Sequence, residues 1–274
     1  MTGAVSDHYN RPDLLARIEK ALGEAGKSPD TATLEDLAPH DEFHIGGRSA
    51  TAKLMPALGL EEGWRCLDVG CATGGVSRYA AHTYGCHVEG VDLTGSFIET
   101  GKTINSWLGL TRYITLHRES ALDMPFDDQH FDAAWMFHVC MNIEQKRELF
   151  AEVFRVLKPG ARFLVYDIMR GEDADTPLTF PLPWAGRQEI SCVRPIERYE
   201  EHIEAAGFAI ERSHPRDDIA SAFFERVAAA DPAGPMRPTG PGREAVENLM
   251  EMYRTGRIMP VEILCRRPTL NGAG

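Results

Sequence analysis

The sequence predicts an α/β fold whose core is a mostly parallel sheet, and three observations lead to this prediction. A short apolar run, Arg65 to Val69, is followed at once by a glycine-rich turn and by a segment that can start a helix. A second apolar run, His87 to Val91, also ends next to an acid. From there to residue 168, strand-like and helix-like segments alternate, as in strands joined by helical crossovers.

The glycine turn at residues 70–75 is the best candidate for a ligand site. In a strand–turn–helix unit, backbone N–H groups and a helix N-terminus face the ligand. Gly70 permits the tight turn, and Gly74 leaves room for a ligand because it carries no Cβ atom. Asp68 can accept hydrogen bonds from the turn or from a cationic ligand, and Asp92 stands where an acid commonly binds ribose hydroxyls. We expect a nucleotide-type site here rather than a buried turn whose acids only cap loops.

Length and composition limit the other possibilities. A chain of 274 residues can bury a full core, and its formal charge of −12, with no run of Lys or Arg, disfavours a nucleic-acid partner. The six cysteines include no C-x-x-C pair, so neither a zinc site nor a disulfide framework is indicated. No apolar run can cross a bilayer and the first residues lack the regions of a signal peptide, so we expect no membrane partner and a cytoplasmic location.

The first 58 residues (1–58) are expected to form a helical segment that covers the site. Apolar residues recur at helical spacing from Leu14 to Leu22, and a brief helical turn is expected from Leu34 to Leu37. Ser49 is expected to be the N-cap of a helix that runs to Leu58.

Residues 59–274 are expected to form the core of the fold. The two strands at 65–69 and 87–91 are expected to be joined by a helix that starts at 76. The elements expected after them are a helix over 96–108, strands over 113–116 and 131–139, a helix over 144–157 and a strand over 161–168. In an open parallel sheet the ligand crevice lies outside the carboxyl ends of the strands. Five polar residues at or beyond these ends are therefore expected to converge on one edge: Asp68, Asp92, Ser120, His138 and Asp167.

Beyond residue 168 the pattern changes, and insertions at about 171–194 and 216–257 are expected to cap the site. A stretch rich in proline and aromatic residues, Thr176 to Trp184, predicts a lid or substrate loop. The remaining expected elements are a helix over 195–206, a strand over 208–213, helices over about 218–230 and 243–254 on either side of a Pro/Gly loop at 231–242, and a last strand over 259–265. The tail at 271–274 is expected to be disordered.

Several of these segments resemble a known family. Leu67 to Gly75, LDVGCATGG, together with Gly90 to Thr94, GVDLT, resembles the cofactor motifs of class I S-adenosylmethionine (SAM)-dependent methyltransferases. Four further segments resemble the sarcosine/dimethylglycine N-methyltransferase-like group, which is also similar to sugar O-methyltransferases of natural-product pathways: Asp41 to Arg48, His138 to Ile143, Tyr166 to Ile168 and Phe180 to Ala185. The resemblance covers about 37–265 and is more specific for SAM than for the methyl acceptor.

The resemblance implies a Rossmann-like sheet of seven strands, the last antiparallel, with helices on both faces and helical additions that cap the active site. It also implies SAM as the cofactor. Carried over by position, the turn from Gly70 to Gly74 would cradle the methionine end of SAM, and Asp92 would bind the ribose hydroxyls. The cofactor-binding residues implied in this way are His44, Asp68, Gly70, Cys71, Ala72, Gly74, Asp92, Leu93, Ser120, Ala121 and Phe137.

Three positions depart from the family pattern. Ala72 replaces the middle glycine of the turn and adds a methyl group where the backbone is expected to pass close to the ligand. Ser120 stands where relatives often have Asp, and it is a weaker partner for the adenine amino group. Ala161 replaces a usual glycine before the fifth strand. The first two departures are expected to weaken SAM binding without abolishing it.

The expected reaction is an in-line displacement at the sulfonium methyl group, for which an enzyme mainly aligns the nucleophile and excludes water. His138 is the first catalytic candidate, as a base that handles the acceptor's proton or as an orienting group. The alternative for His138 is a structural histidine bonded to a backbone carbonyl. Asp167 is the second catalytic candidate, as an orienter of His138, a base or a contact to an ammonium group.

Three further residues are candidate substrate contacts. Asn142 can orient the acceptor, and Trp184 can stack on a methylated ammonium group. Tyr9 can close over the site together with His44, and ordinary packing is the alternative for both.

The sequence thus predicts a SAM-dependent methyltransferase that acts on a nitrogen of a small molecule, amino-acid-like or a secondary metabolite. An O-methyltransferase of a natural-product sugar or hydroxyl is the nearest alternative. An NAD-linked oxidoreductase would share the glycine turn and Asp92 but would not explain Asp68. A non-catalytic SAM-binding protein is a further alternative, which Ala72 leaves open. A small-molecule acceptor is the expected partner, and a homo-oligomer is possible.

Overall fold

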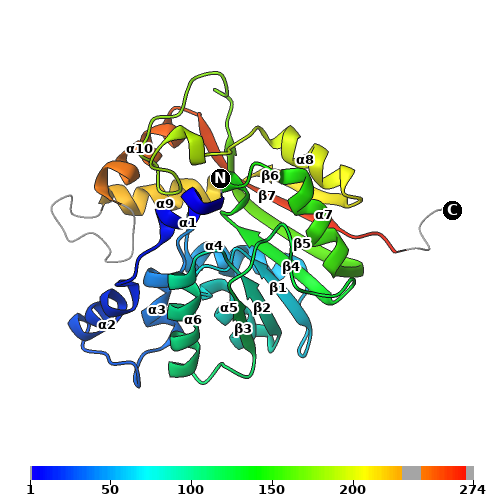
Figure 1. Cartoon of the computed structure of the whole chain (residues 1–274). Coiled ribbons are helices and arrows are strands. Elements are labelled where there is room, and N and C mark those ends of the chain that lie inside the picture. Colours follow the sequence, from blue (N-terminus) through cyan, green and yellow to red (C-terminus); the bar gives the residue numbers. More distant parts are fainter. Residues whose placement is uncertain (1, 230–241, 270–274) are drawn as a thin grey trace.

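The computed structural model describes residues 2–229 and 242–269, and within them the core is a seven-stranded sheet (Figure 1). The strands are β1 (Arg65–Val69), β2 (His87–Val91), β3 (Ile114–His117), β4 (Phe131–Phe137), β5 (Leu157–Arg170), β6 (Ala209–Pro215) and β7 (Ile258–Arg266). Their order is β3-β2-β1-β4-β5-β7-β6, with β7 antiparallel to both of its neighbours and the other pairs parallel. The prediction of a mostly parallel, Rossmann-like sheet with an antiparallel last strand is confirmed.

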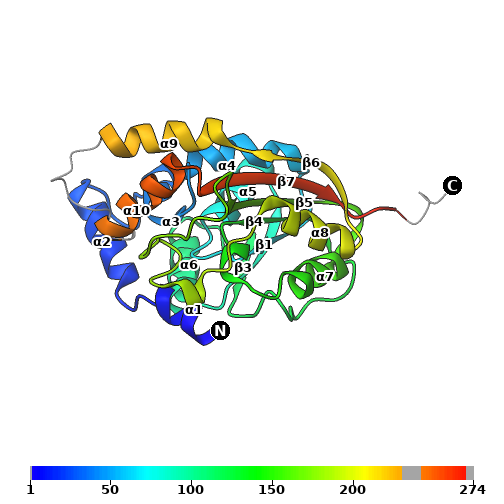
Figure 2. The same ribbon diagram turned by 90° about the horizontal axis from the view of Figure 1, so that it is seen from above.

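Helices cover both faces of this sheet. The α-helices of the described residues are α1 (Thr2–Tyr9), α2 (Leu14–Glu24), α3 (Leu34–Asp41), α4 (Arg48–Leu54), α5 (Gly75–Tyr84), α6 (Gly95–Trp107), α7 (Lys146–Val156), α8 (Ile196–Ala205), α9 (Asp217–Ala229) and α10 (Arg243–Arg254). Short 3-10 helices are η1 (Met55–Leu58), η2 (Cys140–Asn142) and η3 (Gln188–Ile190). Seen from above, α4 and α9 lie on one side of the sheet, and α7 and α8 lie on the other (Figure 2).

The two faces of the sheet are packed by alternate residues of the same strands. In β1, Cys66 belongs to the buried cluster that contains α4 and α5, whereas Leu67 belongs to the cluster that contains α7 and α8. In β4, Trp135 lies on the first side and Met136 on the second. Because both faces are covered there, the central strands β1 and β4 are buried along most of their length, which is why they appear in the sequence as short, mainly apolar runs.

The N-terminal helices are packed directly onto the glycine turn. Gly75, the first residue of α5, meets the end of α3 so closely that a Cβ atom there would lie 2.5 Å from the backbone oxygen of Asp41. Helices α2, α3 and α6 share a buried cluster formed by Leu14, Ile18, Leu22, Leu37, Phe97 and Ile104. The segment after β5 forms a separate cluster with α9 and α10, and Trp184 is buried within it.

The structure corrects three local expectations in the N-terminal segment. Gly47, with φ +51°, is the N-cap of α4, so Ser49 lies inside the helix and is not its cap. A left-handed glycine lets the chain enter the helix two residues earlier. The stretch to Leu58 is completed by η1, since Pro56 has no N–H to continue an α-helix. Helix α3 extends beyond Leu37 to Asp41, and α1 lies within the expected helical segment although no individual helix was placed there.

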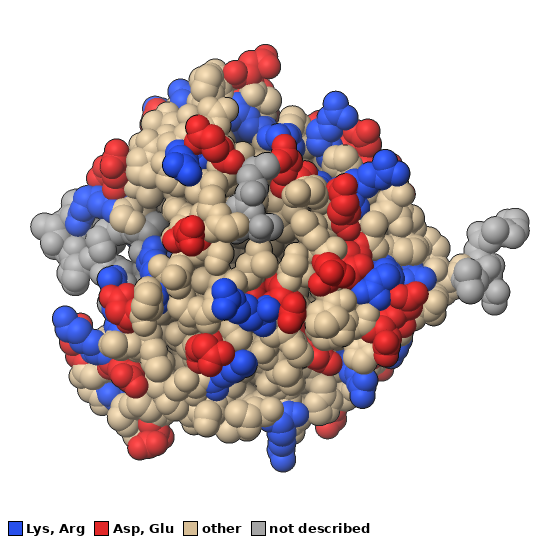
Figure 3. Space-filling view, viewed as in Figure 1, with Lys and Arg blue, Asp and Glu red and all other residues tan. Residues whose placement is uncertain are grey.

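Two expectations fall wholly or mostly outside the described residues. The first is the Pro/Gly loop expected at 231–242, of which only residue 242 is described. The second is the tail at 271–274. No helix of the described part is long and apolar enough to span a membrane. On the face shown in Figure 3, acidic and basic side chains are interspersed rather than gathered into one large basic surface.

Candidate active site

The glycine turn has the backbone conformations that only glycine adopts easily. Gly70 has φ +70°, and a Cβ atom there would lie 2.3 Å from a methyl carbon of Val139. Gly74 has φ +85° and is the N-cap of α5. The turn therefore leads directly into a helix whose first N–H groups have no partner within the helix.

Ala72 also adopts a left-handed conformation, with φ +47°, although it is not glycine. Its N–H donates to Oδ2 of Asp92 at 3.0 Å. The methyl group packs against the buried cluster of α2, α3 and α6. The residue that departs from the family pattern thus packs against protein atoms of this cluster.

Asp92 binds the turn and keeps capacity for a ligand. Its Oδ1 accepts from the N–H of Thr94 at 2.8 Å, and its Oδ2 accepts from Ala72. Burial raises the pKa of Asp92, and these two hydrogen bonds oppose that rise. A carboxylate has about four lone-pair positions, so each oxygen can accept a further hydrogen bond from a hydroxyl.

Asp68 acts within the fold. Its Oδ2 accepts from the hydroxyl of Ser77 at 2.6 Å, which ties the end of β1 to α5. Burial raises the pKa of Asp68 to about 6, against the effect of its hydrogen bonds. Since the carboxylate is buried and bonded to the protein, Asp68 orients α5 behind the turn.

The expected adenine-edge residues lie in short loops after β2 and β3. The hydroxyl of Ser120 accepts from the N–H of Leu122 at 3.2 Å, so it supports its own turn. Leu93 and Ala121 are half-buried. Next to Leu93, a hollow of about 420 Å³ opens between α1 and the start of α6. It is lined by Ser6, Asp7, Asn10, Gly95, Ser96, Glu99 and Arg118.

His138 combines strain, burial and a missing hydrogen-bond partner. It has φ +54°, a conformation that is rare for a bulky residue, and its N–H is held by the carbonyl oxygen of Tyr166 at 2.7 Å. Its Nε2 atom is buried, with no hydrogen-bond partner among residues 2–229 and 242–269. Burial lowers the pKa of His138 well below 6.5, and nearby His44 lowers it further. The imidazole is therefore neutral at pH 7, and one of its nitrogens can accept a hydrogen bond.

His44 lies beside His138, and their ring centroids are 6.1 Å apart. The Nε2 atom of His44 donates to the carbonyl oxygen of Gly47 at 3.0 Å. Burial lowers the pKa of His44 to about 4. Phe137 and Tyr166 complete this ring cluster, with centroids 5.0 Å and 6.2 Å from that of His44.

Asp167 holds the loop that follows β4. Its Oδ2 accepts from the N–H of Met141 at 2.9 Å, and its Oδ1 accepts from the N–H of Ile168 at 2.8 Å. Burial raises the pKa of Asp167 to about 7, and the ammonium group of Lys146 opposes the rise. Because its oxygens bind backbone N–H groups, Asp167 positions η2 and is not seen to orient the ring of His138.

Tyr9, Asn142 and Trp184, the three candidate substrate contacts, are joined in one hydrogen-bond network. The hydroxyl of Tyr9 donates to Oδ1 of Asn142 at 3.0 Å. Nδ2 of Asn142 donates to the carbonyl oxygens of Trp184 at 2.8 Å and Ile190 at 3.0 Å. The indole of Trp184 is buried and donates to Ser191 at 3.0 Å. The network fastens α1 to the segment that follows β5.

Tyr9 also lies near both carboxylates of the edge. Burial raises the pKa of Tyr9, and the charges of Asp92 and Asp167 raise it further. The side chain from α1 is thus close to the residues after β2 and to those of β5.

Two residues that contribute to this edge were missed in the sequence. Tyr166 contacts the rings of both histidines and donates its hydroxyl to the carbonyl oxygen of Ile45 at 3.2 Å. Lys146 is buried and donates to the carbonyl oxygens of Cys140 at 2.7 Å and Ile143 at 2.9 Å. Tyr166 lies in a segment that carries the family resemblance, but no pattern assigned it a role, and Lys146 has no signal beyond its nearness to Asn142, because both roles depend on contacts across the fold.

Comparison with known proteins agrees with this geometry. Residues 67–165 match the family model described as a methyltransferase domain. A sterol 4-C-methyltransferase of Caenorhabditis elegans is 26% identical over 218 residues, which are 78% of this chain and 64% of that protein. The chain thus spans less than two thirds of that relative's length.

Two solved structures show the same fold. A geranyl diphosphate C-methyltransferase from Streptomyces coelicolor A3(2), in complex with Mg²⁺, geranyl diphosphate and S-adenosyl-L-homocysteine, has a TM-score of 0.68 and 21% identity, with 80% of this chain and 78% of that chain covered. A protein from Galdieria sulphuraria described as a sarcosine dimethylglycine methyltransferase has a TM-score of 0.65 and 20% identity, with 80% and 84% covered. The family model agrees with a methyltransferase, whereas the two structures, at 20% and 21% identity, show the fold alone and do not single out the sarcosine/dimethylglycine group.

Proposed function

We propose that this protein is a SAM-dependent methyltransferase that transfers a methyl group to a nitrogen of a small molecule. The observation that carries the proposal is His138, a strained, neutral histidine whose buried Nε2 has no protein partner. It stands at the end of β4, on the edge of the sheet where the glycine turn and Asp92 also lie. Strained residues and unsatisfied buried polar atoms are uncommon, and they concentrate at functional sites.

The residues of the glycine turn fit SAM. Gly70 and Gly74 give the turn its left-handed backbone, and the N-terminus of α5 follows it. Asp92 would accept hydrogen bonds from the ribose hydroxyls, since each of its oxygens has only one backbone donor. When bound, SAM supplies a methyl group attached to a positively charged sulfur. The sulfur is a good leaving group because it becomes a neutral thioether when the bond to the methyl carbon breaks.

In the proposed reaction a lone pair of the acceptor forms the new bond to the methyl carbon while the carbon–sulfur bond breaks. The bonding electrons go to sulfur, which yields S-adenosylhomocysteine, and the acceptor loses one proton. The task of this chain is to align the acceptor, to exclude water and to receive or orient that proton. His138 can do the last because its imidazole is neutral.

The acidic character of the edge favours a nitrogen acceptor. Asp92 and Asp167 both lie close enough to Tyr9 for their charges to raise its pKa, and a carboxylate stabilises a neighbouring ammonium group. An amine acceptor develops positive charge as it takes the methyl group, so these carboxylates favour its transition state. The network of Asn142 and Trp184 would close the acceptor space from the side of the cap. The resemblance to the sarcosine/dimethylglycine group supports an amino-acid-like acceptor.

Methylation of a hydroxyl is the second candidate, and His138 is the observation that favours it. A hydroxyl must lose its proton during attack, and a neutral imidazole with a free nitrogen is a suitable acceptor for that proton.

The test is an assay with SAM labelled on its methyl group and a panel of small acceptors that carry either amines or hydroxyls. We expect label transfer to at least one amine and stoichiometric formation of S-adenosylhomocysteine. Transfer to hydroxyl compounds alone would replace the nitrogen assignment by the O-methyl one. Calorimetry with SAM and with NADH is the control: binding of NADH in place of SAM would refute the methyltransferase proposal.

A further inference from the structure

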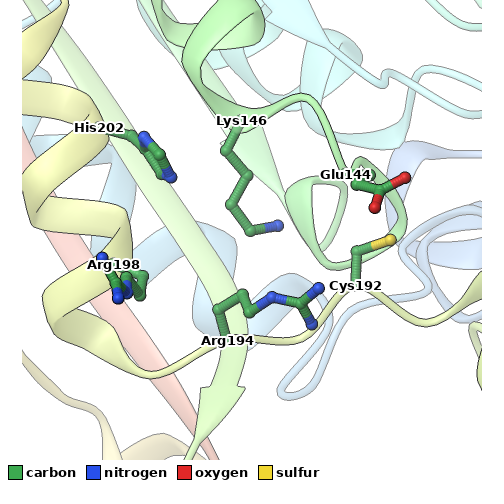
Figure 4. A pocket seen from close by; sticks show the side chains of 6 residues that line it. All are labelled: Glu144, Lys146, Cys192, Arg194, Arg198 and His202. Atoms are coloured by element: carbon green, nitrogen blue, oxygen red, sulfur yellow. The ribbon is translucent and has the colours of Figure 1, made fainter.

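A second polar pocket lies away from the glycine turn, where η2 and α7 meet the segment that enters α8. Its volume is about 180 Å³, and it is lined by Glu144, Lys146, Cys192, Arg194, Arg198 and His202 (Figure 4). A water molecule occupies about 30 Å³ in the liquid, so the pocket can hold a group several times larger than water. The residues come from two parts of the chain, and no function described above uses this space.

The lining of this pocket is basic in a protein whose formal charge is −12. Lys146, Arg194 and Arg198 are cationic, and Glu144 is the one carboxylate among the six lining residues. In Figure 4 the carboxylate of Glu144 lies beside Cys192 and away from the amino group of Lys146. Cations that gather around a cavity, against the overall charge of the protein, attract an anion.

The cations of the pocket retain donors for a ligand. The buried Nζ of Lys146 uses two N–H bonds on the carbonyl oxygens of Cys140 and Ile143 and lies 4.8 Å from the centroid of the Tyr199 ring, which leaves one N–H without a hydrogen-bond acceptor. Arg194 donates from Nη1 to the carbonyl oxygen of Val193, and no ion pair joins it to a carboxylate within the described residues. Arg198 is paired with Glu201 through Nη1 at 2.6 Å, so its other nitrogens remain.

We propose that this pocket is a binding site for a small oxyanion, a phosphate or a carboxylate group. Guanidinium groups bind such oxyanions in a planar, bidentate geometry, and a buried ammonium adds a point charge. Lys146 forms the floor of the site, and Arg194 and Arg198 stand at its exposed side. His202 would add a donor.

An anion at this place would act on the loop that carries Asn142. Lys146 holds the carbonyl oxygens of Cys140 and Ile143 and therefore both sides of η2. Its charge is also the main one that opposes the raised pKa of Asp167. The pocket is thus linked to the candidate active site through a single buried side chain.

The test measures binding of inorganic phosphate to the whole protein by titration calorimetry and by broadening of the phosphorus NMR signal, at constant ionic strength. We expect saturable binding by the wild type and binding at least about tenfold weaker by the double variant Arg194→Gln/Arg198→Gln, because charge-assisted hydrogen bonds are lost. Both arginines are exposed, so this variant is expected to fold. Arg254→Gln is the matched control, since Arg254 has the same exposed i,i+3 pairing, with Glu251.

Glycerol phosphate and succinate, used as further probes, identify the source of the oxyanion: a phosphomonoester, a carboxylate or the free ion. Tightest binding of any one of the three supports the proposal. Absence of saturable binding for all three would overturn it. Equal binding by the double variant and the wild type would also overturn it, as would an equal loss in Arg254→Gln. None of these outcomes depends on methyl transfer.

Discussion

Two segments that contact each other at the edge of the sheet, residues 44–51 and 137–143, each carry a histidine with little exposure to solvent, and the hydrogen bonds of the two Nε2 atoms differ. The rings of His44 and His138 lie 6.1 Å apart, and burial lowers the pKa of both. The Nε2 of His44 is bonded to the carbonyl oxygen of Gly47. The Nε2 of His138 has no partner in the described part of the chain. The first segment provides a hydrogen-bond partner for the Nε2 atom of its histidine, and the second leaves that atom available to a ligand.

This difference lowers the stability of the folded protein, and the loss arises in only one of the two segments. A buried polar atom without a hydrogen bond costs about 1–3 kcal/mol. A bulky residue in a left-handed conformation costs a similar amount, of order 1–3 kcal/mol. His138 bears both, while its backbone N–H is fixed to the carbonyl oxygen of Tyr166. The pairing with β5 thus maintains a conformation that His138 alone would not adopt, and a ligand atom can satisfy Nε2.

The largest effect is expected from replacing His138. If its imidazole takes the acceptor's proton, His138→Ala should lower kcat by roughly 10²–10⁴-fold, with SAM affinity nearly intact. His138→Gln keeps a hydrogen bond but cannot take up a proton, so it should be as slow as His138→Ala. Steady-state kinetics on an accepted substrate measures both.

His44→Gln is the control for this prediction. Its amide can still donate to Gly47, so we expect a loss of stability of about 1 kcal/mol or less and little change in kcat. Near-normal turnover by His138→Gln would end the general-base role and leave alignment as the source of rate. Equal losses in the two histidine variants would remove the distinction between the segments.

The second largest effect concerns Asp167, which anchors the loop of His138. Burial raises its pKa from 3.8 to about 7, so the folded state binds this proton more tightly than the unfolded state does. The stability that results is fully present below pH 3.8 and is lost as the pH rises through about 7. The shift corresponds to at most ~4 kcal/mol, at about 1.36 kcal/mol per pKa unit.

Asp167→Asn should therefore gain stability relative to the wild type as the pH rises from about 4 to 7. Urea unfolding at several pH values measures this difference, and Asp123→Asn, at an exposed position, is the control. A stability difference that does not change with pH would contradict the raised pKa. In kinetics, an acidic limb near pH 7 that persists in His138→Gln would belong to Asp167, because the pKa of His138 lies well below 6.5.

The fold was predictable because its signals are local, whereas the partners within the site are not. Apolar runs, glycines and an acid after β2 mark the strands and the turn within a few residues. By contrast, Tyr9 and Asn142 lie 133 positions apart and meet only once α1 folds back over the edge. Asp68 was expected to accept hydrogen bonds from the turn or from a ligand; one of its oxygens accepts from Ser77 of α5, and nothing in the sequence indicates that partner.

A third prediction separates the cofactor side of the edge from the histidine loop. Asp92→Ala should weaken SAM binding by more than about tenfold, because a charged acceptor for the two ribose hydroxyls would be lost. Titration calorimetry with SAM measures it, with His138→Ala as the reciprocal case in which affinity is kept and turnover is lost. Unchanged affinity would remove Asp92 from the cofactor site.

The smallest effect is expected at Ala72, which shares the left-handed conformation of His138 without an unsatisfied polar atom. Ala72→Gly relieves about 1 kcal/mol of backbone strain, but it adds a similar entropy to the unfolded chain and removes a methyl group packed against the cluster of α2, α3 and α6. We therefore expect a change in unfolding free energy of less than about 1 kcal/mol and unchanged SAM affinity.

Ala72→Val tests whether the methyl group faces the ligand or the helices. A β-branched residue at φ +47° is strongly disfavoured, so this variant should lose stability whether or not SAM is present. Denaturant unfolding measures that loss, and calorimetry on the folded protein measures SAM affinity. If the variant kept its stability and lost only SAM binding, position 72 would face the ligand, as expected from the sequence. If stability and SAM binding were lost together, the backbone strain would be the cause. Left-handed residues at this edge would then be tolerated only where a hydrogen bond fixes the backbone. Asp92 accepts such a bond from Ala72, and the carbonyl oxygen of Tyr166 accepts one from His138.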